Sequence, residues 1–284
     1  GPIYRTFCMI NTFLERARRS AEFRYDRLTT RYRNDRLDQQ FNADRPAMLD
    51  RIDQCITRGV GWLGPQRDVS MSVLYCALQT LRHTADARFE FVRAQMDHYR
   101  ATINDPAFRV VDRDYDDTAP EVANLPSVMD VRPYFDVELM MIDTAWADLR
   151  PQPDILKRLA AFDDDGGYGS THIVIGALIL KENGGADAAA LDALINSQIA
   201  VIAQSNDQTA RAEDLFAERC MVLQWLGLHD LVRPSWVVRL MDRQLPDGGW
   251  TGRNIPPHGQ SNQHTSVLAL AVLAEFLHHH RAKH

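Results

Sequence analysis

The heptapeptide Gln244-Leu245-Pro246-Asp247-Gly248-Gly249-Trp250 decides the fold of this 284-residue chain. Proline, aspartate and paired glycines predict a sharp turn that closes one helix. The chain then reaches His264-Thr265 and a nearly unbroken apolar run, 266–273. A helix that is apolar on every side is buried all round. The stretch therefore predicts a corner that leads into an enclosed inner helix.

The same order of features occurs twice more along the chain. Asp165-Gly166-Gly167-Tyr168-Gly169 precedes Thr171-His172 and an apolar run. A weaker copy, Gly61-Trp62-Leu63-Gly64, precedes Asp68 and another largely apolar segment. Repetition of a turn, an aromatic residue, a polar residue and a buried helix indicates an internal repeat.

Helical periodicity accounts for most of the chain, and no stretch sustains the two-residue alternation of a strand. The predicted helices span 4–42, 46–58, 68–83, 86–103, 135–148, 153–162, 170–183, 186–204, 211–228, 233–244 and 262–280. Some are apolar all round and others are amphipathic, as an inner and an outer ring of helices would require. We therefore predict an all-α fold, an (α/α)6-type toroid with a long N-terminal helix.

The predicted domain organisation has two parts. Residues 1–44 form a basic amphipathic helix in which arginines interleave with acids, and residues 45–284 form the toroid domain. Within that domain, 104–134 is a long loop rich in Pro and Asp, a kind of segment that is often functional. The N-terminal helix is either a solvated helix laced with ion pairs or a helix that lies on a membrane surface.

The first two residues, Gly1-Pro2, match those that a cleaved expression tag leaves behind, so we expect the natural chain to begin further upstream. A removed signal peptide or anchor predicts a membrane-anchored or periplasmic protein, and a removed disordered tail predicts a cytoplasmic one. No segment reaches the roughly 18 apolar residues of a transmembrane helix. Membrane association would therefore act through the truncated N-terminus.

Composition and charge are those of an ordinary globular protein. The formal net charge is −6, with 45% apolar and 25% charged residues, which argues against a nucleic-acid partner. We find no phosphate-binding loop, dinucleotide fingerprint or nucleophile elbow, so we expect no nucleotide cofactor. The widely spaced cysteines are either buried free thiols or include one disulfide, Cys55–Cys76.

The turn at 244–250, with the pattern Q-x-x-D-G-G-W before an apolar helix, resembles the repeat of the squalene-cyclase and protein-prenyltransferase β-subunit superfamily. The resemblance covers the C-terminal part of the chain well and the N-terminal part only by architecture. It implies an (α/α)6 toroid with a central cavity that binds an apolar, isoprenoid-like substrate.

The same resemblance implies a zinc site. Prenyltransferase β subunits hold zinc through an acid and a cysteine two positions apart, and through a later histidine in a His-Thr pair. Glu218, Cys220 and His264 match that order, with glutamate in place of the family's aspartate. A carboxylate, a thiolate and an imidazole leave the fourth zinc position for substrate or water.

The repeat places polar side chains at the starts of inner helices, where each would face one mouth of the toroid. His172 and His264 are candidate catalytic histidines, and Asp164 and Asp165 are candidate acids or metal ligands. Candidate substrate-binding residues are Asp68, Asp136, Glu138, Tyr168, Trp250 and His258. Each also has a structural interpretation, because carboxylates cap helices, histidines and aromatic residues pack in cores, and acidic turns are solvated.

The segment Asp114-Tyr115-Asp116-Asp117-Thr118-Ala119 spells the D-x-D-D-T-A acid motif of class II terpene cyclases. A catalytic acid of that kind needs a desolvated carboxyl group at the start of a buried helix. Pro120 and a polar, Pro-rich segment follow instead, so we interpret this match as a coincidence.

Three functions remain open. The working hypothesis is an enzyme of the terpenoid-cyclase or prenyltransferase type, zinc-dependent in its prenyltransferase form, with an apolar substrate in the cavity. The second is a carbohydrate-active lyase or hydrolase that uses histidines and carboxylates on a glycan in an open cleft. The third is a non-catalytic binding module that is anchored to a membrane through its N-terminus.

Overall fold

Helices make up most of the part of the chain that the structure describes. This computed structural model describes residues 27–103, 105–115, 137–149, 154–184, 186–209, 211–252 and 260–282. Within these ranges there is no β-strand, and the strand-like pairing is limited to one isolated antiparallel bridge between Trp250 and Asn262. The predicted all-α class is confirmed.

Residues 27–43 are helical, and further helices joined by connecting segments follow. They are α2 Arg45–Leu63, α3 Met71–Thr84, η1 Ala87–Glu90, α4 Phe91–Thr102, η2 Pro106–Val110, α6 Val137–Ala145, α7 Ile155–Ala160, α8 Tyr168–Asn183, α9 Ala188–Gln208, α10 Asp214–Trp225, η4 His229–Leu231, α11 Pro234–Met241 and α12 Gln263–Ala282. Where described, each matches a predicted helix within a few residues, apart from the short 3-10 elements.

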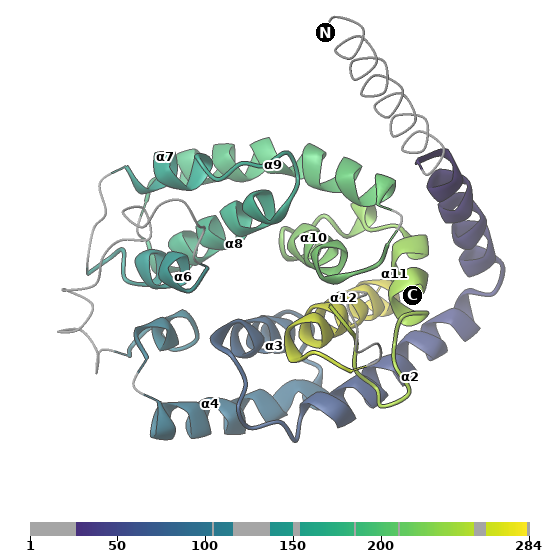
Figure 1. The fold of residues 1–284 in the computed structure, drawn as a ribbon, viewed down its shortest axis with the longest axis horizontal. Helices are drawn as coiled ribbons and strands as arrows, with labels where there is room; N and C mark the ends of the chain where they lie inside the picture. The colour runs from purple at the N-terminus through teal and green to yellow at the C-terminus, as the bar shows by residue number, and fades with distance from the viewer. Residues whose placement is uncertain are drawn as a thin grey trace, which may run out of the picture.

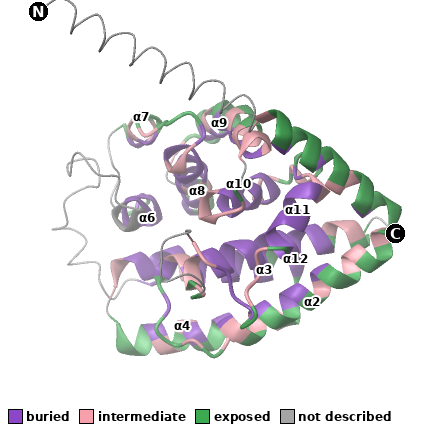
Figure 2. Cartoon of the chain, turned by 45° about the vertical axis from the view of Figure 1, so that its right-hand side comes forward, coloured by how far each residue is buried: buried purple, intermediate pink, exposed green. Residues whose placement is uncertain are grey.

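Five helices, α3, α6, α8, α10 and α12, form the interior of the part of the chain that the structure describes. Helix α12 packs against α3 on one side and α10 on the other, and α8 packs against both α10 and α6 (Figure 1). The residues of α12 are buried without interruption from Thr265 to Leu277, and those of α10 from Phe216 to Gln224 (Figure 2). Helices that are buried on all sides are largely apolar all round, as these sequences predict.

Amphipathic helices cover this interior. Helix α2 buries Ile52, Cys55, Ile56, Gly59 and Leu63, a stripe with helical spacing, and it packs against α12. Helix α9 packs in the same way against α8 and α10 (Figure 1). The predicted alternation of enclosed and amphipathic helices is therefore present in the described residues.

The corner at 244–250 joins α11 to α12. The Trp250 side chain is buried, and its indole N–H donates to the Leu240 carbonyl oxygen at 2.8 Å. Gly248 has a φ of +102°, which side chains other than hydrogen rarely tolerate. The Gln244 amide donates to the carbonyl oxygens of Cys55 and Gly248, at 2.8 and 2.9 Å. The corner is thus tied to α2 as well as to its own helices.

The predicted third copy of the repeat is wrong in one respect. The segment Gly61-Trp62-Leu63 does not form a turn, because α2 continues to Leu63 and ends at Gly64 in a right-handed helical conformation. Isolated glycines within a helical pattern lower its stability without ending it.

The helical segment 27–43 docks on the body mainly through its acids, and Arg31 adds a contact of 3.6 Å to Asp207. Arg233, which precedes α11, contacts Asp35 and Asp38 at 2.5 Å and Asp207 at 2.9 Å. The Asp38 carboxylate also accepts a hydrogen bond from the backbone N–H of Ser235, at 2.6 Å. Residues 4–26 of the predicted long helix lie outside the described residues. None of the helices that the structure describes is long and apolar enough to cross a membrane.

The Pro/Asp-rich segment predicted at 104–134 is described only over 105–115. That part contains η2, which packs against α6 and α3 and buries Ala107 and Phe108. Asp114, at the start of the D-x-D-D-T-A match, is exposed, and the rest of the match lies outside the described residues from 116 onward. Cys55, Cys76 and Cys220 are buried free thiols, so the alternative of a Cys55–Cys76 disulfide is wrong.

Candidate metal centre

Two carboxylates one helical turn apart on α10 organise the candidate site. Asp214 begins α10 and Glu218 follows four residues later, so both side chains lie on one face of the helix. Helix α8 flanks this face on one side and α12 on the other. Because all three helices begin here, their N-terminal ends bring polar side chains to the same place.

Glu218 is held by two side chains of α8. Its Oε1 accepts a hydrogen bond from the Thr171 hydroxyl, and His172 Nε2 lies 3.3 Å from the same oxygen. The carboxyl group is almost completely buried, with 1% of its side chain exposed. Burial raises the pKa of Glu218 to about 8; the Thr171 hydrogen bond opposes this shift, and the negative charge of Asp214 adds to it.

Asp214 is held in a similar way by α12, with help from α8. The Thr265 hydroxyl donates to Asp214 Oδ1 at 2.7 Å, and His264 Nε2 lies 3.7 Å from Oδ2. The Tyr168 hydroxyl donates to Oδ2 at 2.9 Å. Each carboxylate of α10 therefore faces one Thr-His pair of a neighbouring inner helix. The pairs Thr171-His172 and His264-Thr265 are the polar residues that the repeat pattern singled out.

Asp214, Glu218 and His264 form a group that could hold a metal ion. One ligand atom from each lies within 4.8 Å of the others. Two carboxylate oxygens and an imidazole nitrogen are a donor set that zinc and other divalent ions accept in proteins, with a position left for substrate or water. The donor chemistry thus fits the zinc that the family resemblance implies, although through a different set of ligands.

Cys220 does not belong to this group. Its sulfur is completely buried and accepts a hydrogen bond from the Asn206 amide at 3.0 Å. Burial raises the pKa of the Cys220 thiol to about 12, which favours the neutral thiol over the thiolate that zinc binds. Residues two apart on a helix are separated by about 200° around its axis, so Glu218 and Cys220 face different neighbours. In the group of possible metal ligands, Asp214 takes the role that the family resemblance gave to Cys220.

His172 lies beside the metal group rather than within it. Its ring stacks on Tyr168, with centroids 5.9 Å apart and an interplanar angle of 25°. Burial, and then the nearby His264, lower the pKa of His172 to about 4. The ring is therefore neutral near pH 7 and contacts a carboxyl group that is itself largely protonated.

The acidic turn before α8 supports the backbone instead of entering the site. The Asp164 carboxylate accepts hydrogen bonds from the backbone N–H groups of Gly169 and Ser170, at 2.9 and 3.0 Å. Asp165 is exposed and has a positive φ of 55°. Arg219 of α10 donates to the Gly166 carbonyl oxygen at 2.7 Å. This turn therefore fixes the start of α8, and with it Tyr168, against α10.

A cavity of about 460 Å³ adjoins the metal group. Its lining comes from the segment before α3, from α3, α4 and α6, and from the link between α4 and η2: Arg67, Asp68, Val69, Ser70, Met71, Ser72, His98, Tyr99, Thr102, Ile103, Asp105 and Met141. Ser72 connects the cavity to the site, because its hydroxyl oxygen lies 3.3 Å from His264 Nδ1.

The predicted substrate-binding residues divide among these places. Asp68 lines the cavity, Tyr168 contacts Asp214, and Trp250 is buried in its corner. Glu138 belongs to α6. Asp136 and His258 lie outside the described residues.

Asp214 is the site residue that the sequence interpretation missed. Its signal was available, because Asp214 and Glu218 are four apart at the start of a largely apolar helix. Comparison with known proteins adds no further assignment: no protein family matches the chain, and the search of curated proteins found no match.

Proposed function

We propose that this chain is a zinc-dependent enzyme of the terpenoid-cyclase or prenyltransferase type, built as an (α/α)6-type toroid. The observation that supports the proposal is the metal-compatible group Asp214, Glu218 and His264 at the edge of a cavity of about 460 Å³. The cavity wall includes Val69, Met71, Ile103 and Met141, which suit an apolar, isoprenoid-like substrate.

The residues around the metal group have separate tasks. Thr171 and Thr265 donate to Glu218 and Asp214 and so fix the direction of their remaining oxygens. Tyr168 holds Asp214 from the α8 side. Bound zinc would supply a Lewis acid at the end of the cavity.

The proposal is tested by measuring metal content and product formation in the same preparation. We expect protein purified without chelators to bind about one zinc per chain and to convert members of a panel of isoprenoids and isoprenoid diphosphates. Glu218→Gln resembles the neutral form of this buried side chain, so we expect it to fold and to lose both zinc and turnover. Turnover that survives both a chelator and Glu218→Gln would rule the zinc enzyme out.

A second candidate is supported by the two neighbouring carboxyl groups of Asp214 and Glu218 on α10, together with the raised pKa of Glu218. A carboxyl group that stays protonated near pH 7 can act as a general acid, and the neighbouring Asp214 carboxylate can act as a base. Such a pair suits a carbohydrate-active lyase or hydrolase. Cleavage of a glycan by metal-free protein, abolished by Glu218→Gln, would favour this candidate over the first.

A further inference from the structure

Ser72 lies between the cavity and the metal group. It is the second residue of α3, and its hydroxyl is the point at which the cavity lining contacts His264. The two ring nitrogens of His264 face different partners. Nε2 is 3.7 Å from Asp214 Oδ2, and Nδ1 is 3.3 Å from Ser72 Oγ.

Binding of a metal ion would determine which of the two His264 ring nitrogens carries the hydrogen. An imidazole binds a metal through an unprotonated nitrogen, and the other nitrogen then carries the hydrogen. Nε2 faces the carboxylates of the metal group, so it is the nitrogen that would bind. The Nδ1–H group must then donate, and Ser72 Oγ is the acceptor within reach.

Ser72 can accept this hydrogen bond because its own hydroxyl hydrogen can be donated to a second acceptor. Ser70 Oγ lies 2.9 Å from Ser72 Oγ. Ser70 is the N-cap residue of α3 but makes no side-chain capping hydrogen bond, so its oxygen is available to Ser72. A directed chain results: His264 Nδ1–H donates to Ser72, and the Ser72 hydroxyl donates to Ser70.

We propose that Ser72 is a positioning residue of the metal centre, which selects the His264 tautomer with an unprotonated Nε2 and fixes the plane of the ring. The proposal rests on the proposed metal site. It also links that site to the substrate, because a ligand in the cavity that hydrogen-bonds Ser72 would change the acceptor available to His264.

The test compares zinc affinity in three serine variants by competition with a chelator of known affinity. Removing a partner of a metal-binding histidine typically weakens binding about 10–100-fold, and we expect a loss of that order for Ser72→Ala. Ser72→Thr keeps the hydroxyl and should bind within a few fold of the wild type. Ser197→Ala removes an exposed hydroxyl on α9, far along the chain from the site, and should change nothing.

A second readout is independent of affinity. The ring ¹⁵N shifts of His264 in the zinc-loaded protein should show a metal-bound Nε2 and a protonated Nδ1 whose hydrogen exchanges slowly. In Ser72→Ala this hydrogen should exchange faster. Thermal melting of each variant shows whether it is folded.

The outcomes separate this inference from the proposed function. Equal zinc affinity in wild type, Ser72→Ala and Ser72→Thr would overturn the role of Ser72 while leaving the metal site intact. An equal loss in Ser72→Ala and Ser72→Thr would assign the effect to packing and would also overturn it. Wild-type protein that binds no zinc would overturn both proposals together.

Discussion

Glu218 and Asp214 belong to one turn of α10, yet they contact solvent to different extents. The Glu218 side chain is 1% exposed and the Asp214 side chain 14%. The more buried carboxyl group therefore carries the larger desolvation penalty, and its pKa is raised to about 8. A metal ion would add positive charge beside this buried carboxylate, where the charge of Arg219 only partly offsets the effect of burial.

Cys220 is a zinc ligand in the set that the family resemblance implies, but it is absent from the group that the structure brings together. We expect Cys220→Ala to keep its zinc, because the sulfur contacts Asn206 and does not belong to the group of three. The lost contact should lower the free energy of unfolding by about 1–2 kcal/mol. Metal analysis and urea denaturation of the same sample measure both effects, and loss of zinc from folded Cys220→Ala would restore the original ligand set.

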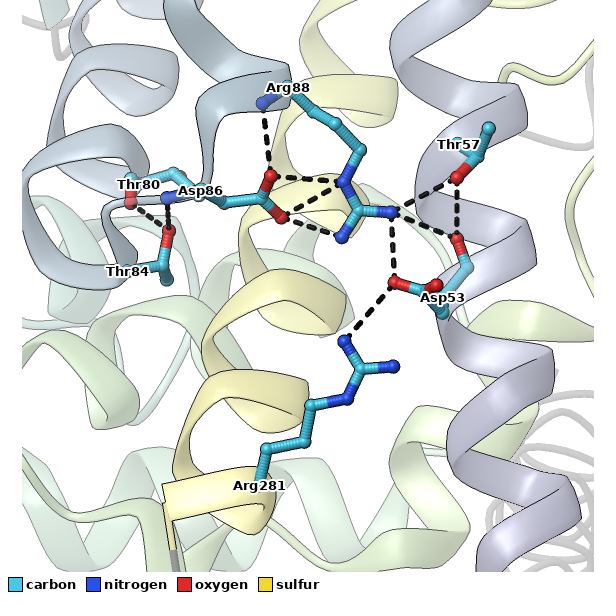
Figure 3. Close-up of polar contacts among 7 residues, drawn as sticks. All are labelled: Asp53, Thr57, Thr80, Thr84, Asp86, Arg88 and Arg281. Atoms are coloured by element: carbon cyan, nitrogen blue, oxygen red, sulfur yellow. Dashed lines mark hydrogen bonds and ion pairs between the residues drawn. The ribbon is translucent and has the colours of Figure 1, made fainter.

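Asp86 carries a predicted pH dependence that is independent of the metal group. Its carboxylate contacts the Arg88 guanidinium at 2.6 and 3.0 Å and accepts a hydrogen bond from the Arg88 backbone N–H (Figure 3). Arg88 also contacts Asp53, which Arg281 approaches to 3.5 Å. Burial by itself raises the pKa of Asp86, but the hydrogen bonds and charge of Arg88 outweigh it and hold the pKa below its ordinary value.

Because the pKa of Asp86 is lower in the folded protein, its carboxylate stabilises the fold at pH values above the unfolded-state pKa of about 4. This stability is lost as the pH falls through the folded-state pKa. We expect Asp86→Asn to be about 1 kcal/mol less stable than wild type at pH 7 and to approach it below about pH 3. Urea denaturation across this range measures the difference. Asp192→Asn, which removes an exposed partner of Lys181, is the control and should show little pH-dependent difference. A constant Asp86→Asn deficit at every pH would contradict the expectation.

At the scale of helices, the contact between α2 and α12 depends on a small residue. A Cβ atom at Gly59 would lie 2.7 Å from Leu270 Cδ2 and 2.9 Å from Trp250 Cζ3, whereas one at Gly61 would meet nothing within 4 Å. We expect Gly59→Ala to lower the free energy of unfolding by about 1–3 kcal/mol through overpacking. Gly61→Ala should raise it by about 0.5–1 kcal/mol, because alanine favours the helix.

Urea denaturation of this pair distinguishes packing from helix propensity, since both glycines belong to α2. If both variants were stabilised equally, the close approach of α2 to Trp250 and Leu270 would be incorrect.

The helices themselves were largely predictable from sequence, and the limits of that prediction have physical causes. Apolar periodicity identified α8, α10 and α12 because their burial leaves few polar positions. Gly61 suggested a turn at a position where α2 continues to Leu63, since packing against α12 outweighs the cost of glycine in a helix. The turn predicted at Asp247-Gly248-Gly249 is confirmed, because the backbone there has a positive φ at Gly248, which glycine readily adopts.

The site was only partly predictable, because its geometry depends on how separate helices face one another. His172, His264 and Glu218 were identified from their positions at the starts of inner helices, and the structure brings them together around α10. Spacing along one helix could not show that Cys220 turns toward Asn206 while Asp214 turns toward His264. That distinction requires the neighbouring helices to be in place.

Over the whole molecule, the starts of α3, α8, α10 and α12 converge on one small region. Ser72, Thr171, Asp214 and His264 reach it from four different helices. A stable core made of the remaining, apolar lengths of these helices holds the polar ends in position. The interior is thus a scaffold for one candidate metal centre.

The most direct test locates the metal itself. Crystals of chelator-free protein supplied with zinc, measured above and below the zinc absorption edge, give an anomalous difference map. We expect a peak about 2.0–2.2 Å from one oxygen of Asp214, one oxygen of Glu218 and Nε2 of His264. Occupied zinc beside Cys220 or among His278, His279 and His280, with no peak between Asp214 and His264, would contradict it.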